Sequence, residues 1–406
     1  MTARSGDRLV LAYSGGLDTS VLLKKLIAEG REVIAMTADL GESDAASGAG
    51  AKAELDRIAD KARSLGAYAT VVVDARARFL SGYAMPALAA NALYQGVYPL
   101  SSALSRPLIA ALLVETAEQY GANAVAHGCT GKGNDQVRIE LGVRSLAPDL
   151  TVRAPLRETP FSRPEALAYA AQHAIPVAHT AAKPYSIDAN LWGRSIEAGV
   201  LEDLWTAPPE DAFAWTAGPA SWPAEPTEIE IAWTDGVPRC TNREGVALVA
   251  WLNELAGKHG VGRIDMVEDR VIGVKSREVY EAPAATVLIG AHRALERLVL
   301  TRDELRFKSG ADQRYAELVY DGLWTSPLRG ALDAFNAALA PRLTGTVRLR
   351  LHAGTVTVTG LASPFALYDE KLATYGAGDR FDHSAASGFI QCYGLPLLLQ
   401  AERARG

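Results

Sequence analysis

The spacing of apolar residues along the first half of the chain predicts an alternation of strands and helices. Apolar runs typical of strands occur at 8–13, 32–40, 69–75, 123–128 and 151–156, with helical patterns between them at 18–30, 52–66 and 105–121. Each of these helical patterns ends in a glycine, as a helix often does at its C-terminal cap. Regular alternation predicts βαβ units, and therefore a mostly parallel sheet with helices on both faces.

The pattern changes near residue 181, which predicts a second domain of the α+β class. The stretch 181–227 is rich in Pro and Trp and is typical of a crossing segment rather than a regular layer. Beyond it, strand and helix patterns are mixed, with helical runs from Pro283 to about Ala340. A hairpin-like alternation of apolar residues follows over 344–360.

Composition and charge narrow the class of protein. The 406 residues fit two domains, and 49% hydrophobic with 22% charged residues is ordinary for a globular enzyme. A net charge of −6 argues against a nucleic-acid partner. No apolar run approaches the ~18 residues of a membrane span, and the first residues contain no apolar segment typical of a signal peptide. Cys129, Cys240 and Cys392 are widely spaced, which suits free thiols, so we expect a cytoplasmic protein.

The stretch LVLAYSGGLDTS, residues 9–20, predicts a strand, a tight turn and the start of a helix. Its two glycines permit a close approach of backbone N–H groups to an anion, and three hydroxyl residues flank them. The loop is not a P-loop, because it lacks the GK[ST] ending and carries Asp18 where a cation is expected. We interpret it as a phosphate cradle in which Asp18 either caps the helix or positions a metal ion.

A second glycine-rich loop, HGCTGKGNDQVR at 127–138, also follows a predicted strand. It combines three glycines with a Lys, a Thr and an Asp. Because the carboxyl ends of parallel strands meet at one edge of a sheet, the two loops predict one pocket for an anion or a substrate. None of the seven histidines has the spacing of metal ligands, so we expect no structural zinc site.

Four stretches together resemble the argininosuccinate synthase family: AYSGGLDTS, HGCTGKGNDQVR, YSIDANLWGRSIEAGVLED and GKHGVGRIDMVEDRVIGVKSREVYE. The first alone is shared with the wider N-type ATP pyrophosphatase superfamily, whereas the second loop and the NLWGRS segment are specific to this family. The match is ordered and runs from about residue 8 to the GFI segment near residue 390. It therefore covers nearly the whole chain.

The resemblance implies an α/β fold in three parts. These are an N-terminal parallel-sheet ATP pyrophosphatase domain of the adenine nucleotide alpha hydrolase-like kind (1–180), an α+β synthetase and multimerisation domain (181–365), and a C-terminal oligomerisation segment (366–406). The implied reaction joins L-citrulline to L-aspartate through citrullyl-AMP, with ATP released as AMP and pyrophosphate, in arginine biosynthesis. The family also implies a homotetramer, with no nucleic-acid or membrane partner.

The resemblance assigns site residues by their positions in the matching motifs. ATP is expected at Ala12, Tyr13, Ser14, Gly15, Gly16, Leu17, Asp18, Thr19, Ser20, Ala38 and Gly128. Citrulline is expected at Tyr98, Asn134, Arg138, Ser186, Ser195, Glu268 and Tyr280, and aspartate at Thr130, Asn134 and Asp135. In this setting the first loop holds the leaving pyrophosphate, and Asp18 helps to hold the Mg²⁺ that neutralises it. We expect catalytic roles for Asp18 and Asp135, and either Asp135 or a phosphate oxygen takes the proton of the aspartate amine.

Two positions depart from the family pattern. The chain has Ala103 where a serine typically contacts citrulline, and neighbouring Ser101 or Ser102 can substitute for it. It also has Cys129 where a small alanine is usual.

Two other classes of protein share the first loop. A tRNA-modifying adenylating enzyme predicts a basic groove and often a pair of catalytic cysteines, and the chain has neither feature. A non-catalytic nucleotide-binding module leaves the second glycine loop and the long second domain without a purpose.

Overall fold

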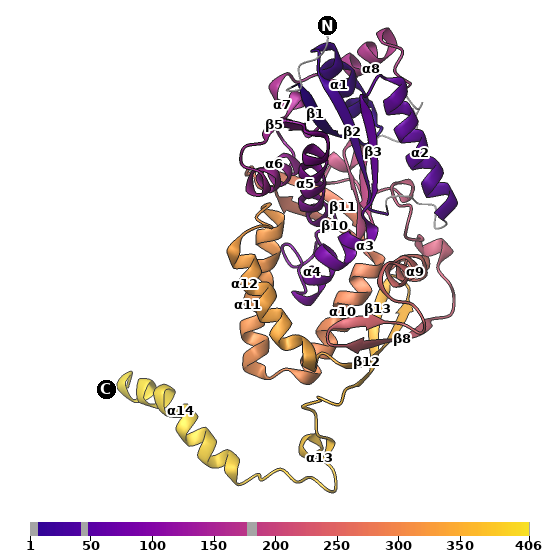
Figure 1. Ribbon diagram of the computed structural model, residues 1–406. Coiled ribbons are helices and arrows are strands. Elements are labelled where there is room, and N and C mark those ends of the chain that lie inside the picture. The colour runs from indigo at the N-terminus through magenta and orange to yellow at the C-terminus, as the bar shows by residue number, and fades with distance from the viewer. Residues whose placement is uncertain (1–6, 42–47, 177–184, 406) are drawn as a thin grey trace.

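A computed structural model describes residues 7–41, 48–176 and 185–405 of the chain (Figure 1). The predicted domain boundary between 180 and 181 lies outside the described residues, as do the first six residues. The division into three parts therefore stays a prediction.

The first half forms a parallel sheet, as the apolar pattern predicts. Over the described residues it has five strands in the order β3-β2-β1-β4-β5, and all of its neighbouring strands pair in parallel. The strands are β1 (Arg8–Ala12), β2 (Glu32–Asp39), β3 (Ala69–Asp74), β4 (Ala124–Ala126) and β5 (Thr151–Arg153). All five predicted strands are confirmed, although the last two are shorter than the apolar runs indicate.

Helices cover both faces of this sheet (Figure 1). Leu9 and Leu11 of β1 pack in one buried cluster with residues of α1 and α8, whereas Val10 packs in another cluster with residues of α5. Alternate side chains of a strand point to opposite faces, so both faces of β1 are buried. The helices are α1 (Leu17–Ala28), α2 (Gly48–Ser64), α3 (Arg76–Phe79), the π-helical turn η1 (Leu80–Ala84), α4 (Met85–Ala89), α5 (Ser101–Tyr120), α6 (Asp135–Leu146), α7 (Pro155–Glu158) and α8 (Arg163–Gln172).

The second half contains two four-stranded antiparallel sheets among its described residues. The first has the order β10-β11-β7-β6, and the second has the order β13-β12-β8-β9. The strands are β6 (Ser186–Asn190), β7 (Gly193–Glu197), β8 (Thr227–Thr234), β9 (Val237–Arg239), β10 (Arg263–Asp269), β11 (Lys275–Glu281), β12 (Gly345–His352) and β13 (Thr355–Ala362). The predicted hairpin over 344–360 is confirmed as β12 and β13, and mixed strands and helices confirm the α+β class.

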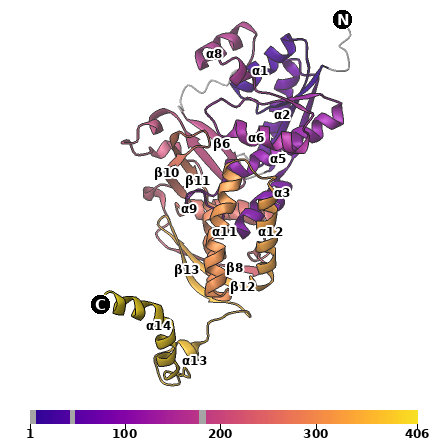
Figure 2. The same ribbon diagram turned by 90° about the vertical axis from the view of Figure 1, so that its left-hand side faces the viewer.

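The helices of the second half lie between and beside these sheets (Figures 1 and 2). They are α9 (Gly245–Lys258), α10 (Pro283–Val299), α11 (Arg302–Tyr320) and α12 (Pro327–Leu339), followed by the 3₁₀ turn η5 (Ala340–Arg342). The predicted helical runs between Pro283 and Ala340 are therefore confirmed. Buried α10 packs against α9 and against the sheet of β12 and β13.

One prediction was wrong. The stretch 181–227 is not only a crossing segment, because β6 and β7 form an antiparallel hairpin that joins β11 in a sheet. The described residues 198–226 match the prediction, with only the short 3₁₀ turns η2 (Gly199–Glu202), η3 (Glu210–Ala212) and η4 (Pro219–Ser221) before β8 begins at Thr227.

A C-terminal tail projects away from the rest of the molecule (Figures 1 and 2). It carries α13 (Glu370–Ala373) and α14 (Ala385–Arg403), and neither helix has a buried residue. None of the helices in the described part of the chain is long and apolar enough to cross a membrane.

Candidate active site

The first glycine loop connects β1 to α1 and has a shape that requires glycine. Gly15 has a φ of +76°, and a Cβ there would lie 2.9 Å from the side chain of Ile58. Lys61 on α2 donates to the Gly15 carbonyl at 2.7 Å, and the Ser14 and Thr19 hydroxyls lie 3.1 Å apart. The loop is thus fixed by α2 while its N–H groups remain at the start of α1, where an anion is stabilised.

Asp18 is exposed in the first turn of α1. The N-cap of this helix is Gly16, without a side-chain cap, so the capping alternative predicted for Asp18 is wrong. The Asp18 carboxylate bonds to no other described side chain or backbone group. No described group therefore competes with a ligand for its two oxygens.

The second glycine loop lies beside the first. It follows β4, which is the parallel neighbour of β1, and it ends where α6 begins at Asp135. A Cβ on Gly128 would lie 3.3 Å from the side chains of Thr19 and Leu22, so the two loops approach closely. Ala38 lies near the end of β2, on the other side of β1. The residues expected to contact ATP thus lie at the carboxyl ends of three adjacent strands.

A cavity of about 100 Å³ lies next to the second loop and brings together much of the expected amino-acid site. Of the residues expected to bind citrulline or aspartate, it is lined by Tyr98, Asn134, Asp135, Arg138, Ser195, Glu268 and Tyr280. Two expected residues do not line it: Thr130 is exposed in the glycine loop, and Ser186 is exposed at the start of β6. Ser186 nevertheless lies two residues before Asp188, which lines the cavity, and so shares its face of the strand.

The antiparallel sheet of β6, β7, β11 and β10 supplies one wall of this cavity. Ser195 on β7 pairs with Asp188 on β6 and with Tyr280 on β11, so these side chains lie on the same face. The same alternation brings in Glu197 on β7 and Glu278 on β11, which the sequence did not indicate. Arg270, which the sequence also did not indicate, reaches the cavity from the turn after β10.

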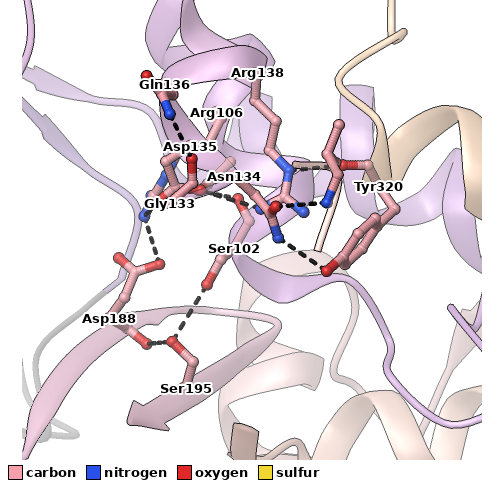
Figure 3. A network of polar contacts seen from close by, with 12 residues as sticks. Ser102, Arg106, Gly133, Asn134, Asp135, Gln136, Arg138, Asp188, Ser195 and Tyr320 are labelled. Atoms are coloured by element: carbon pink, nitrogen blue, oxygen red, sulfur yellow. Dashed lines mark hydrogen bonds and ion pairs between the residues drawn. The ribbon is translucent and has the colours of Figure 1, made fainter. Parts of the chain in front are cut away.

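Asp135 is held between two arginines (Figure 3). Arg106 donates to one oxygen at 2.8 Å and Arg138 to the other at 3.1 Å, and Arg106 also bonds Asp188 at 2.7 Å. Burial opposes the ionisation of Asp135, but the two guanidiniums outweigh it and hold the pKa of this carboxyl below its usual value. Asp135 is therefore ionised, and each of its oxygens already accepts a hydrogen bond from an arginine.

Arg138 has one nitrogen free for a ligand. Its side chain is only 4% exposed, and its Nε donates to the Tyr320 carbonyl at 2.9 Å. Its Nη2 has no hydrogen-bond partner among the described residues, although it is buried. A buried guanidinium N–H without a partner is costly, and a substrate carboxylate would satisfy it.

The other side of the cavity is acidic. Burial raises the pKa of Glu268, against the hydrogen bonds that Tyr320 and Tyr280 donate to it. Burial and a neighbouring carboxylate also raise the pKa values of Glu197 and Glu278. Arg270 donates to these two glutamates at 2.8 and 2.7 Å and to the Lys132 carbonyl of the second loop at 3.2 Å. The hairpin of β10 and β11 is thereby tied to the glycine loop, and the cavity suits a ligand that carries an ammonium group.

The two departures from the family pattern lie beside the cavity, although neither residue lines it. Ala103 is fully buried, and Ser102 lines the cavity, 3.4 Å from the Ser195 hydroxyl (Figure 3). Of the two neighbouring serines, Ser102 is therefore the better placed to replace the missing one. Burial, together with nearby Asp135, raises the pKa of the Cys129 thiol to about 12, so this thiol is protonated at neutral pH.

Comparison with known proteins identifies the family. A model of the "Arginosuccinate synthase N-terminal HUP domain" matches residues 8–176, and one of the "Arginosuccinate synthase C-terminal domain" matches residues 185–400. The argininosuccinate synthase of Gloeobacter violaceus is 52% identical over 400 residues, which cover 97% of this chain and 98% of that protein. The argininosuccinate synthase of Geobacillus kaustophilus is 54% identical over 395 residues, which cover 97% of this chain and 95% of that protein.

A much weaker likeness links the chain to a solved structure, a 4-thiouridine synthetase–RNA complex with bound ATP. Its TM-score is 0.30 and its sequence identity 18%, over 41% of this chain and 40% of that one. So remote a likeness says nothing about the chemistry of this chain. The two family models and the relatives of more than 50% identity over almost the full length are decisive: the chain belongs to the argininosuccinate synthase family.

Proposed function

We propose that this ligase joins L-citrulline to L-aspartate with ATP, forms argininosuccinate through citrullyl-AMP, and releases AMP and pyrophosphate. The observation that carries the proposal is the cavity beside the second glycine loop. Its lining includes Arg138, whose buried Nη2 has no partner among the described residues and suits a carboxylate, and the buried carboxylates of Glu268 and Glu278, which suit an ammonium group. A zwitterionic amino acid has this combination of charges, and the adjoining first loop supplies the anion site for a nucleotide.

ATP is assigned to the two glycine loops. Its pyrophosphate end would lie against the loop 14–16 and the N-terminal turn of α1, with Ala38 and Gly128 on either side of β1. Backbone N–H groups and the positive end of the helix dipole stabilise the charge of a phosphate. The leaving pyrophosphate is then stabilised by groups that are already in position.

The first loop also fits Mg²⁺ bound together with ATP. Asp18 offers a carboxylate without another partner among the described residues, and Ser14 and Thr19 offer hydroxyl oxygens, which are donors that Mg²⁺ prefers. The described residues contain no group of three or more His, Cys, Asp or Glu side chains able to hold a metal alone, so phosphate oxygens would complete the coordination. Bound there, Mg²⁺ would neutralise charge on the pyrophosphate.

Citrulline is assigned to the cavity. Arg138 would bind its carboxylate and Glu268 its ammonium group, with Tyr98, Ser195 and Tyr280 around the chain of the substrate. Asn134 contacts both amino acids in this assignment, while Thr130 and Asp135 belong to aspartate. Ser186 stays in the citrulline set, and substrate binding would have to bring it to the cavity from its exposed place on β6.

The reaction needs no side-chain nucleophile. The ureido oxygen of citrulline attacks the α-phosphorus and expels pyrophosphate, and the neutral amine of aspartate then displaces AMP from the ureido carbon. Asp135 has a lowered pKa and oxygens already bonded to Arg106 and Arg138, so it is a weak base. It is better suited to orient these two arginines, which leaves a phosphate oxygen as the proton acceptor. Alignment and charge stabilisation supply the rate.

An isotope experiment tests the reaction and identifies the phosphorus atom of ATP that citrulline attacks. Citrulline labelled with ¹⁸O in the ureido group is incubated with ATP, aspartate and the purified protein, and the products are analysed by mass spectrometry. Because the attacking oxygen stays on phosphorus, AMP should carry one ¹⁸O, pyrophosphate should be unlabelled, and argininosuccinate should appear. ADP as the product, or unlabelled AMP, would contradict the proposal.

We also propose a cytoplasmic homotetramer joined through residues 366–406. Phe389, Ile390 and Tyr393 on α14 are each more than 60% exposed, and such a row of apolar side chains is typical of an interface. Deletion of the chain after residue 365 is expected to reduce the molar mass in light scattering from four copies to fewer. A truncated protein that remains tetrameric would show that the interface lies elsewhere.

A further inference from the structure

Tyr320 links several residues of the proposed citrulline site from a distant part of the chain. It is the last residue of α11 and is fully buried. Its hydroxyl accepts a hydrogen bond from Asn134 Nδ2 at 2.9 Å and donates to Glu268 Oε1 at 2.7 Å. Figure 3 shows Tyr320 reaching toward Asn134 and Arg138 from the side opposite to Ser195.

The direction of these hydrogen bonds is fixed by their outer partners. The backbone N–H of Val271 donates to Asn134 Oδ1 at 2.9 Å, so the amide nitrogen of Asn134 must face Tyr320. A tyrosine hydroxyl has one proton, and because Asn134 already donates to it, that proton goes to Glu268. The other Glu268 oxygen accepts from Tyr280 at 2.7 Å. One hydroxyl therefore bonds both Asn134 and Glu268, and each of these side chains has one further anchor, in Val271 and Tyr280 respectively.

The rest of Tyr320 is held just as firmly. Its ring stacks on Tyr94 with 3.5 Å between centroids and 4° between planes, and the Arg138 guanidinium lies 4.7 Å from its ring centroid. Two residues later, Gly322 has a φ of +79°, and a Cβ there would lie 2.9 Å from the Cα of Arg138. The end of α11 is thus packed directly on the start of α6, with no space for a larger residue.

We propose that Tyr320 is a positioning residue for citrulline binding, whose hydroxyl orients the Asn134 amide and the Glu268 carboxylate toward the substrate. This inference rests on the proposed function, in which Asn134 and Glu268 contact citrulline. Tyr320 does not line the cavity and acts through its two partners. Its loss should therefore weaken citrulline binding more than it slows the chemical step.

The test is Tyr320→Phe, which removes the hydroxyl and keeps the ring, its stacking on Tyr94 and its carbonyl bond to Arg138. We expect the KM for citrulline to rise about 10-fold, with kcat changed less than about 3-fold and the KM for ATP unchanged. Tyr315→Phe is the matched control, because Tyr315 is also fully buried on α11 and bonds to none of the cavity residues. It should leave all three parameters unchanged.

The pH profile separates positioning from a general loss of structure. A hydrogen bond to a carboxylate stabilises its charged form, so loss of the Tyr320 hydroxyl raises the pKa of Glu268. The acid limb of kcat/KM for citrulline should then move upward by about half a pH unit or more. The groups that face Glu268 are Tyr280 and Glu278 on β11, Arg270 beyond β10, Arg138 on α6, Tyr320 on α11, and Tyr94 and Tyr98 before α5. The substitution removes the hydroxyl of Tyr320 and leaves the other groups in place.

A double-mutant cycle with Glu268→Gln completes the test. If Tyr320 acts through Glu268, the double variant should bind citrulline little worse than Glu268→Gln alone.

If Tyr320→Phe fails to fold, Tyr320 can be replaced site-specifically by 3-fluorotyrosine. This residue keeps the size of the side chain and makes the hydroxyl a stronger hydrogen-bond donor, so the acid limb of kcat/KM for citrulline should move downward. The inference is overturned if the effects of the two substitutions on citrulline binding add, or if Tyr320→Phe leaves the citrulline KM and the pH profile unchanged. Either result counts only when the wild-type protein makes argininosuccinate. A wild-type protein that makes none would instead overturn the proposed function.

Discussion

Arg138→Met should lower kcat/KM for citrulline by about 10³-fold and leave the KM for ATP nearly unchanged. Two donor groups of this guanidinium are held by Asp135 and by the Tyr320 carbonyl, and its buried Nη2 has no partner among the described residues. Removal of one partner of a buried charge pair costs about 2–5 kcal/mol, and 10³-fold corresponds to about 4 kcal/mol. Most of the loss should appear in the KM for citrulline, because the carboxylate is bound equally in the ground and transition states.

The control for this variant lies on the same helix. Arg144 is exposed near the end of α6 and only approaches Glu140, at 3.5 Å, so Arg144→Met should keep wild-type kinetics. Arg138→Met leaves Asp135 paired with Arg106, which limits the loss of stability, and a thermal melt checks that it is folded. A folded Arg138→Met protein with an unchanged citrulline KM would remove Arg138 from the site.

The parallel sheet could be predicted because its central strands are buried on both faces. The strand 32–39 has five consecutive buried residues and therefore reads as an apolar run without alternation. The glycines that end the helical patterns all have positive φ: +86° at Gly30, +98° at Gly66 and +62° at Gly121. Local signals and tertiary burial agree in this half, which is why the order of elements could be predicted from the sequence.

The hairpin of β6 and β7 was missed for the opposite reason. Its residues Asp188, Ser195 and Glu197 line the cavity, so the face that would normally be apolar is polar. Hydrophobic alternation, which is the main signal of a half-buried strand, is absent from a strand that faces a substrate site. Strands of an active site are therefore harder to recognise from composition than strands of a core.

Only those parts of the site whose residues lie close together in the sequence could be predicted. The glycine loops are recognisable because glycines, hydroxyls and charges are concentrated in a few residues. Glu278 reaches the cavity through the register of β11 against β7, and Tyr320 reaches Asn134 across 186 residues of chain. Neither relation has a local signal, because register and helix docking are set by tertiary packing. The resemblance to the family supplied Glu268 and Tyr280, which the residue pattern alone did not single out.

Asp18 combines features that make it the sharpest test of the first loop. Its carboxylate is exposed at the start of α1, it bonds to no other described group, and the helix does not use it as a cap. An asparagine has almost the same shape, so Asp18→Asn changes the charge at this position and little else. Its effects can therefore be read as effects on the ligand rather than on the fold.

Asp18→Asn should lower kcat by about 10²-fold and raise the Mg²⁺ concentration needed for half-maximal activity, with the melting temperature almost unchanged. The charge of the pyrophosphate grows as it leaves, so a group that holds Mg²⁺ beside it stabilises the transition state more than bound ATP. Asp74→Asn is the control, because Asp74 ends β3 at the same edge of the sheet but its carboxylate is bonded by Arg76 at 2.6 Å. That variant should keep the wild-type Mg²⁺ dependence. If Asp18→Asn at saturating Mg²⁺ turns over as fast as the wild-type protein, Asp18 has no part in the reaction, and the first loop binds ATP through its backbone and hydroxyls alone.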